Sequence, residues 1–216
     1  MSVPLFDAAT PRAPLREELL AAIDRVLDFE RFVLGPEVAA FESELAAYCG
    51  ASQAVGVANG TDAITIALRA MGAGPGDEVI VPSFTFYASV EAIVHTGATP
   101  VFCDIDPDTY CLTPDTVRAA LTPRTTAVIA VHLFGNVAPV AEIEALGVPV
   151  LEDAAQAMGS GSAAGRPGAL GAVATFSFYP SKNLACFGDG GAIVTNDEAI
   201  AEEARVLRFH GSRDKV

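Results

Sequence analysis

Short hydrophobic runs alternate with amphipathic segments through most of the chain. The runs predict seven strands, at residues 54–58, 78–81, 99–103, 127–131, 148–151, 172–178 and 192–195. The segments between them predict helices at residues 61–71, 84–95, 114–121, 140–146 and 197–209. Strands that are apolar almost throughout are buried on both faces, as in a parallel sheet covered by helices. The pattern therefore predicts an α/β fold with three layers, in which a mostly parallel sheet has helices on both faces.

A different pattern precedes residue 53. Prolines at positions 4, 11 and 14 suggest an extended arm over residues 1–13, whereas residues 15–27 and 37–48 carry apolar positions at helical spacing. Pro36 is well placed to open the second helix, and Gly50 to end it. We expect both helices to be packing elements without chemistry of their own. The chain then divides into an N-terminal arm and helix (1–35) and a larger domain (36–216).

Composition narrows the function. The 216 residues suit one large α/β domain, and 51% of them are hydrophobic, so a sizeable core is expected. A formal net charge of −14 argues against nucleic acid and anionic membrane surfaces as partners, because both require a basic face. We find no signal peptide and no apolar run near the ~20 residues that span a bilayer. Four dispersed cysteines indicate free thiols in a reducing cytoplasm, and three isolated histidines indicate no metal site.

Ligands of such sheets bind outside the carboxyl ends of the strands, so the polar residues there are the first candidates. After the first strand, Gly60, Thr61 and Asp62 open a helix whose free N–H groups suit a phosphate. An ordinary helix cap by Asn59 or Thr61 is the alternative. Asp153 follows the fifth strand, where a carboxylate suits a metal, a cap or a cationic ring nitrogen.

Lys182 follows the sixth strand and is one of two lysines in the chain. Its sequence neighbours are largely apolar, among them Phe178, Leu184 and Phe187. We expect little water around this amine, which would make it a usable nucleophile or base. A lysine that snorkels to cap a loop is the alternative. Ser177 adds a hydroxyl near the same rim.

A phosphate cradle, an acid and a lysine at three strand ends are the parts that hold pyridoxal phosphate (PLP). The lysine forms a Schiff base, the acid keeps a proton on the pyridine nitrogen, and the helix N-terminus binds the phosphate. Phe84, Phe86 and Tyr87 follow another strand end and can supply an aromatic ring that stacks on the pyridine. Dinucleotide-binding, P-loop, nucleophile-elbow and zinc motifs are absent from the sequence.

With these residues, the chain resembles the large domain of the DegT/DnrJ/EryC1/StrS family, the nucleotide-sugar aminotransferases among the fold-type I PLP enzymes. The most specific matches are EDAAQAMG at residues 152–159 and FSFYPSKNLACFGDGGAIVTND at residues 176–197. Further matching segments lie at residues 31–50, 59–68, 74–86, 97–110 and 121–135.

The resemblance implies a role for each matching position. Lys182 forms the Schiff base and moves the proton, and Asp153 pairs with the pyridine nitrogen. Tyr179 is a candidate substrate-side hydroxyl, although a ring packed under the loop is equally consistent. The other implied contacts to PLP are those of Gln156 with the ring hydroxyl, Phe86 with the ring face, and Gly60, Thr61, Asp62 and Ser177 with the phosphate.

The implied activity is ping-pong transamination. An amino acid, usually glutamate in this family, gives its amino group to a keto-sugar linked to a nucleoside diphosphate. Lysine rather than histidine at position 182 favours transamination over dehydration. The run KNLACFGDGG at residues 182–191 resembles relatives that act on 3-keto sugars rather than 4-keto sugars. The family also implies a homodimer.

Family members are longer, so the resemblance implies a small C-terminal domain that this sequence lacks and, as a consequence, impaired activity. The alternatives are a truncated paralogue that binds PLP without catalysis and a PLP-dependent sugar dehydratase or epimerase. A nicotinamide-dependent dehydrogenase does not fit, because the glycine fingerprint is absent.

Overall fold

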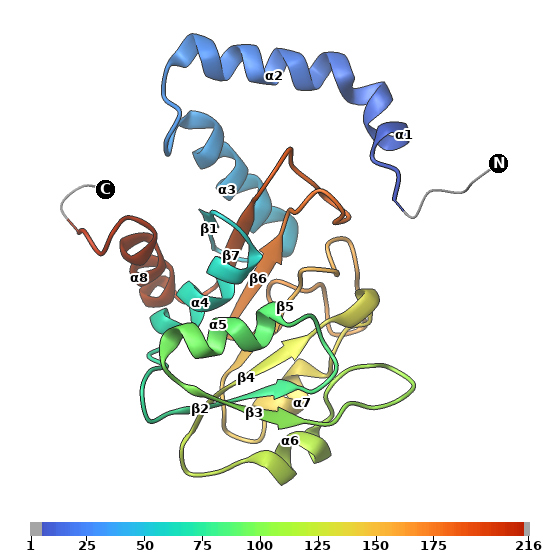
Figure 1. The fold of residues 1–216 in the computed structure, drawn as a ribbon, viewed down its shortest axis with the longest axis vertical. Helices are drawn as coiled ribbons and strands as arrows, with labels where there is room; N and C mark the ends of the chain where they lie inside the picture. Colours follow the sequence, from blue (N-terminus) through green and yellow to red (C-terminus); the bar gives the residue numbers. More distant parts are fainter. Residues whose placement is uncertain (1–5, 214–216) are drawn as a thin grey trace.

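A seven-stranded sheet forms the centre of the molecule in a computed structural model, which describes residues 6–213 (Figure 1). The strands follow one another across the sheet in the order β1-β7-β6-β5-β4-β2-β3. Their bounds are Gln53–Val57 (β1), Glu78–Pro82 (β2), Thr99–Cys103 (β3), Thr125–Val131 (β4), Val150–Asp153 (β5), Val173–Ser177 (β6) and Gly191–Thr195 (β7). Each predicted strand is therefore present, with its ends displaced by at most two residues.

The sheet is mostly parallel, as predicted. Strands β3, β2, β4, β5 and β6 pair in parallel, whereas β7 is antiparallel to β6 and β1 is antiparallel to β7. No helix lies between β6 and β7, so the chain returns directly along its neighbour. Ser177 consequently pairs with Gly191, and the loop over residues 178–190 stands at the carboxyl end of β6. This loop carries Lys182.

Helices cover both faces of the sheet, which confirms the three-layer architecture. On one face, α4 (Gly60–Ala70), α5 (Ala88–Thr96) and α8 (Glu198–Arg208) pack on alternate strand residues such as Ile129. On the other face, α6 (Pro114–Ala120) and α7 (Val140–Glu144) pack on the intervening residues, and α3 (Pro36–Cys49) covers the end near β1. The two residues that end β5, Glu152 and Asp153, therefore face opposite layers.

Two predicted segments differ from the structure by more than such small displacements. Helix α5 begins at Ala88 rather than at residue 84, because Phe84 to Phe86 form a loop beside the sheet. The predicted extended arm contains a short helix, α1 (Ala9–Arg12), and a 3-10 turn over Ala13–Leu15. Asp7 accepts hydrogen bonds from the N–H groups of Ala9 and Thr10, which stabilises that first turn. Residues 1–5 of the predicted arm lie outside the described residues.

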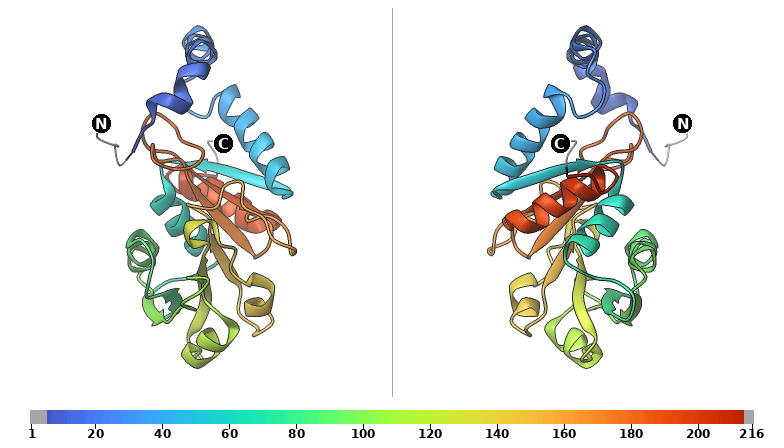
Figure 2. Two further views of the ribbon diagram at one scale, coloured as in Figure 1. Left: turned by 90° about the vertical axis from the view of Figure 1, so that its right-hand side faces the viewer. Right: turned by 90° about the vertical axis from the view of Figure 1, so that its left-hand side faces the viewer.

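The expectation that both N-terminal helices pack was half wrong. Helix α3 buries Leu45, Ala46 and Cys49 against the sheet, but α2 (Arg16–Phe29) buries no residue. Figures 1 and 2 show α2 standing beyond the sheet, between α1 and the start of α3. Helical spacing reveals an apolar face without revealing what covers it. Within the described part of the chain, no helix is long and apolar enough to cross a membrane.

Candidate active site

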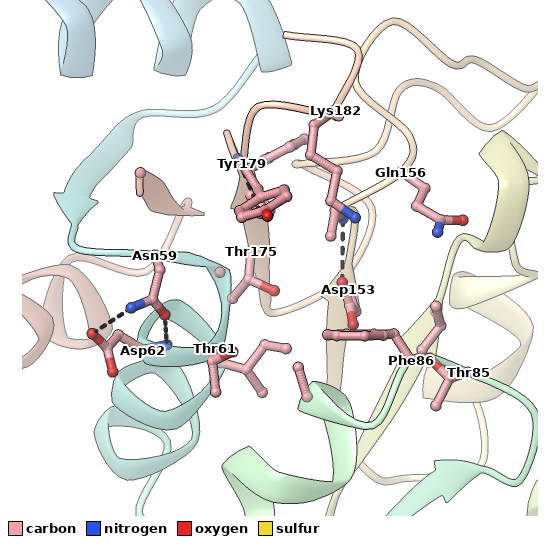
Figure 3. Close-up of a pocket in the computed structure, with 18 of the residues that line it drawn as sticks. Asn59, Thr61, Asp62, Thr85, Phe86, Asp153, Gln156, Thr175, Tyr179 and Lys182 are labelled. Carbon is pink, nitrogen blue, oxygen red and sulfur yellow. Dashed lines mark hydrogen bonds between the residues drawn. The ribbon is translucent and has the colours of Figure 1, made fainter. Parts of the chain in front are cut away.

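A cavity of about 730 Å³ opens at the carboxyl ends of β4, β5 and β6, beside the N-terminus of α4 (Figure 3). Five separate segments of the chain line it, at residues 59–64, 85–91, 131–133, 153–156 and 175–190. All the site residues expected from the sequence border this one cavity: Gly60, Thr61, Asp62, Phe86, Asp153, Gln156, Ser177, Tyr179 and Lys182. The fold thus joins positions that lie more than a hundred residues apart in the sequence.

The first turn of α4 forms one end of the cavity. Asn59 caps the helix, because its Oδ1 accepts a hydrogen bond of 2.8 Å from the Asp62 N–H (Figure 3). The Asp62 N–H, expected to bind a phosphate, is therefore already bonded within the protein. The N–H groups of Gly60 and Thr61 have no protein acceptor among the described residues. These two donors and the positive end of the helix remain available to an anion.

Two glycines allow this turn to approach the sheet closely. A Cβ atom built on Gly60 would lie 2.7 Å from Cβ of Ser177, and one built on Gly191 would overlap the backbone of Asn59. Larger residues at these positions would separate the helix from β6 and β7. The result is a shallow cradle that contains two free N–H groups and the hydroxyls of Thr61 and Ser177. Such a donor set fits a phosphate.

Asp153 stands at the end of β5 and is 6% exposed. Both of its oxygens accept hydrogen bonds, Oδ2 from the Ser89 hydroxyl at 2.8 Å and Oδ1 from the Ala155 N–H at 3.2 Å. A carboxylate held in this way at a cavity edge fits a protonated ring nitrogen. The Ser89 contact was missed at the sequence level. Its only signal was a serine among the apolar positions of α5, namely Ala92 and Ile93.

Gln156 lies across the cavity from the phosphate cradle. Its Oε1 accepts a hydrogen bond of 2.8 Å from the backbone N–H of Phe134. Because an N–H group can only donate, this bond fixes the orientation of the amide. The Nε2 group is then free to donate to a ligand. Gln156 thus fits the expected role as a donor to a ring oxygen.

Lys182 extends from the loop over residues 178–190 into the space above Asp153, between Tyr179 and Gln156 (Figure 3). The backbone N–H of Lys182 donates to the Tyr179 carbonyl at 2.8 Å, which closes a tight turn. The side chain is half-buried, and the expectation of dry, apolar surroundings was wrong. Leu184 and Phe187 are 48% and 66% exposed, because the loop directs them outward.

A family model for the DegT/DnrJ/EryC1/StrS aminotransferases matches residues 14–216. The chain belongs to the DegT/DnrJ/EryC1/StrS aminotransferase family. Over 217 residues it is 52% identical to the dTDP-3-amino-3,4,6-trideoxy-alpha-D-glucose transaminase of Streptomyces venezuelae, covering 99% of this chain and 57% of that protein. This chain therefore spans a little over half the length of that relative.

Two solved structures of PLP-type aminotransferases share the fold. The crystal structure of S. venezuelae DesV in complex with a ketimine intermediate superposes with a TM-score of 0.95 at 52% identity, covering 99% of this chain and 58% of DesV. The structure of NtdA from Bacillus subtilis with its bound cofactor PMP gives a TM-score of 0.91 at 33% identity, covering all of this chain and 50% of NtdA. The fold of this DegT/DnrJ/EryC1/StrS chain is therefore that of the family's PLP-dependent members.

Behind the cavity of this family member lies a buried polar pair that sequence reasoning also missed. Glu152 and His132 are fully buried, and Nε2 of the histidine lies 2.9 Å from Oε2 of the glutamate. His132 Nδ1 accepts a hydrogen bond from the Ala138 N–H, so Nε2 carries the proton and donates to Glu152. The same carboxylate accepts from the N–H groups of Gly168, Leu170 and Gly171.

The cavity lining carries more negative than positive charge. Asp62, Glu91, Asp153 and Asp189 line it, and Lys182 is the one cation among the described lining residues. An anion in this cavity would therefore depend chiefly on backbone N–H groups and hydroxyls. Across residues 6–213 no group of three or more His, Cys, Asp or Glu side chains could hold a metal ion.

Proposed function

We propose that this chain is the PLP-binding part of an aminotransferase that acts on nucleotide sugars. It would move an amino group from an amino acid, glutamate in the first instance, to a keto-sugar linked to a nucleoside diphosphate. One observation carries the proposal: a single cavity holds Lys182, Asp153 and the free N–H groups of Gly60 and Thr61. These are the lysine, acid and phosphate site that PLP requires.

PLP, when bound, supplies an electron sink that stabilises negative charge on the carbon bearing the amino group. Lys182 supplies the amine that tethers the cofactor. Asp153 would accept a hydrogen bond from the ring nitrogen and keep its proton in place, while Gln156 Nε2 would donate to the ring oxygen. Gly60, Thr61 and Ser177 would hold the phosphate together with the N-terminus of α4, and Phe86 would contact the ring.

Proton transfer is assigned to Lys182. When its Nζ is not joined to the cofactor, Lys182 would take the proton from the substrate carbon that bears the amino group, hold it as an ammonium and deliver it to the cofactor. A positioned general base of this kind contributes about 10²–10⁴-fold to the rate. The turn closed by the Lys182 N–H and the Tyr179 carbonyl restricts the loop that carries this amine.

The substrate is proposed to be a sugar with its keto group at C3. The S. venezuelae transaminase, at 52% identity, is named for a 3-amino sugar. Asp189, which stands where relatives acting on 4-keto sugars often carry glutamate, lines the cavity. Tyr179 also lines the cavity and is 55% exposed, so its hydroxyl can face a substrate.

We further propose that the protein is a cytoplasmic homodimer. The family resemblance supports the dimer. The cysteines support a reducing compartment, since Cys49, Cys103, Cys111 and Cys186 are all free thiols.

The test uses the purified 216-residue chain and its two lysines. Added PLP should produce a visible absorbance band, and borohydride should then fix the cofactor to the peptide containing Lys182. Lys182→Ala should abolish both signals, while Lys215→Ala, the matched control, should keep them. If Lys182→Ala still reacts like the native chain, the proposal is wrong.

A second step separates a transaminase from a passive binder of PLP. Glutamate should convert the bound cofactor to its amino form and release 2-oxoglutarate in equal amount. A chain that binds PLP on Lys182 but does not respond to any amino acid is the non-catalytic alternative. Nucleotide-linked 3-keto and 4-keto sugars, offered to the amino form, then identify the acceptor.

A further inference from the structure

A chain of hydroxyl groups ends on Asp153, the residue proposed to hold the cofactor's ring nitrogen. We propose that Ser89 is a positioning residue that holds the Asp153 carboxylate ready to accept from that nitrogen, and that Thr85 sets the direction of the Ser89 hydroxyl. The inference rests on the proposed function, because it assumes that PLP occupies the cavity.

The three side chains come from two separate segments. Ser89 lies in the first turn of α5, is 1% exposed, and donates to Asp153 Oδ2 at 2.8 Å. Thr85 precedes α5, lines the cavity, and places its Oγ1 3.1 Å from Ser89 Oγ. Asp153 is thereby tied to a helix as well as to its own strand.

The direction of each bond follows from proton counting. An ionised carboxylate can only accept hydrogen bonds, so the Ser89 hydroxyl must donate its one proton to Asp153. The contact between Ser89 and Thr85 must then be donated by Thr85. In this order, Thr85 donates to Ser89 and Ser89 donates to Asp153. The Ser89 proton therefore does not point toward the Thr85 hydroxyl.

The two donors to Asp153 act on different oxygens. Ser89 bonds Oδ2 and the Ala155 N–H bonds Oδ1, so rotation of the carboxylate about its bond to Cβ is restrained at both ends. Each oxygen still has a lone pair, and the restraint fixes where those lone pairs point. A ring nitrogen that donates a proton along such a direction meets an acceptor that needs no rearrangement.

Packing alone does not explain a serine at this position. The buried face of α5 consists of Ser89, Ala92, Ile93 and Thr96, and alanine would occupy almost the same volume as Ser89. The Thr96 hydroxyl serves the helix itself, because it donates to the Ile93 carbonyl at 2.7 Å. The Ser89 hydroxyl instead leaves its helix and serves the cavity.

The experiment compares PLP binding by the native chain, Ser89→Ala, Thr85→Val and the control Thr96→Val. Hydrogen bonds to charged groups are the stronger ones in proteins, so Ser89→Ala should raise the PLP dissociation constant about tenfold. Thr85→Val should raise it by about two- to threefold, since the Ser89 hydroxyl remains. Thr96→Val removes a buried hydroxyl from the same helix without touching Asp153 and should leave the constant unchanged.

Two further measurements distinguish a loss of Asp153 positioning from a general disturbance of the folded structure. With ¹⁵N-labelled PLP, the ring-nitrogen chemical shift should change in Ser89→Ala and stay constant in Thr96→Val. In an Asp153→Asn background, Ser89→Ala should have a much smaller effect, because the two residues act as one unit.

The outcomes distinguish failure of the proposed function from failure of the positioning role of Ser89. A native chain that does not bind PLP refutes the proposed function and this inference with it. A native chain that binds, together with a Ser89→Ala variant of unchanged dissociation constant and unchanged nitrogen shift, refutes the inference alone. If Ser89→Ala does not fold, Thr85→Val decides, and unchanged binding in that variant refutes the role of the hydroxyl chain.

Discussion

The contact between Gly60 and Ser177 sets the shape of the phosphate cradle at the scale of single atoms. No other residue type leaves room there, since even a Cβ atom would come within 2.7 Å of the serine side chain. The same requirement holds at Gly191, against the backbone of Asn59. These glycines are needed for close approach of the chain rather than for flexibility.

Gly60→Ala should therefore weaken PLP binding at least tenfold, because the added methyl group pushes the α4 N-terminus away from Ser177. Overpacking of this kind also costs about 1–3 kcal/mol of stability. Fluorescence titration with PLP and thermal unfolding measure the two effects. Gly74→Ala is the matched control, since a Cβ there meets no atom within 4 Å. Equal PLP affinity in the two variants would contradict the cradle.

A second effect at residue scale concerns Cys49, a buried thiol of α3. Burial raises its pKa from 9.0 to about 11, and the nearby Glu152 charge acts in the same direction. The folded state thus holds the proton more tightly than the unfolded state. Stability from this group is complete below pH 9 and is lost as the pH rises from about 9 to about 11.

Between those pH values the native chain should lose about 1–3 kcal/mol of unfolding free energy through Cys49. Urea unfolding at several pH values, compared with Cys49→Ala, isolates this contribution, because other groups titrate alike in both proteins. Cys186→Ala, which removes a partly exposed thiol, should keep the native slope. A Cys49→Ala variant that also keeps that slope would show that the thiol does not contribute.

At the scale of elements, the Glu152–His132 pair joins parts that the sheet alone does not hold. The Glu152 side chain bonds the loop around Gly168 to Gly171, and the His132 ring bonds the turn that ends at Ala138. The backbone N–H of His132 also donates to the Asp153 carbonyl at 3.0 Å. The pair therefore supports the strand end that presents Asp153 to the cavity.

Glu152→Gln should lower the unfolding free energy by about 2–4 kcal/mol, because an amide group would face a cluster of N–H donors in a buried site. Glu142→Gln, an exposed change on α7, should stay within about 0.5 kcal/mol of the native value. Chemical denaturation monitored by circular dichroism measures both. A Glu152→Gln variant as stable as the control would mean that the buried carboxylate is not required.

The sequence predicted where the helices and strands lie better than how they pair and pack with one another. The strands could be found because a strand that is buried on both faces carries a continuous apolar run, as β4 does from Ala127 to Val131. The antiparallel direction of β7 could not be predicted, because it depends on the absence of a helix in the loop over residues 178–190. For α2 the apolar face was evident, yet nothing local specifies what lies against it.

In the candidate site, too, some residues could be identified from the local sequence and others only from the folded structure. Lys182, Asp153 and Gln156 lie in segments whose residue order itself carries the family pattern. Ser89 and His132 act through contacts with residues 64 and 20 positions away in sequence, and the local sequence does not reveal the partner in such a contact. Their importance becomes visible only when the folded chain brings α5 and β4 against the end of β5.

At the scale of the whole molecule, the cavity depends on five separated segments, so a ligand that fills it binds only the folded chain. Such a ligand stabilises the fold by RT ln(1 + [L]/Kd), which is about 2.7 kcal/mol at a hundred times the dissociation constant. For a domain of this size, that corresponds to a rise in melting temperature of roughly 5–11 °C. PLP should therefore raise the melting temperature of the native chain by this amount.

Pyridoxal, which lacks the phosphate, separates the two halves of the site in the same measurement. It can occupy the space between Lys182 and Asp153 but leaves the N–H groups of Gly60 and Thr61 unused, so at equal concentration it should stabilise the chain much less than PLP. In Gly60→Ala the advantage of PLP over pyridoxal should shrink, because the cradle is displaced, whereas Gly74→Ala should preserve it. If pyridoxal and PLP stabilise the native chain equally, the phosphate does not bind at α4, and the N-terminus of that helix is only a capped helix end.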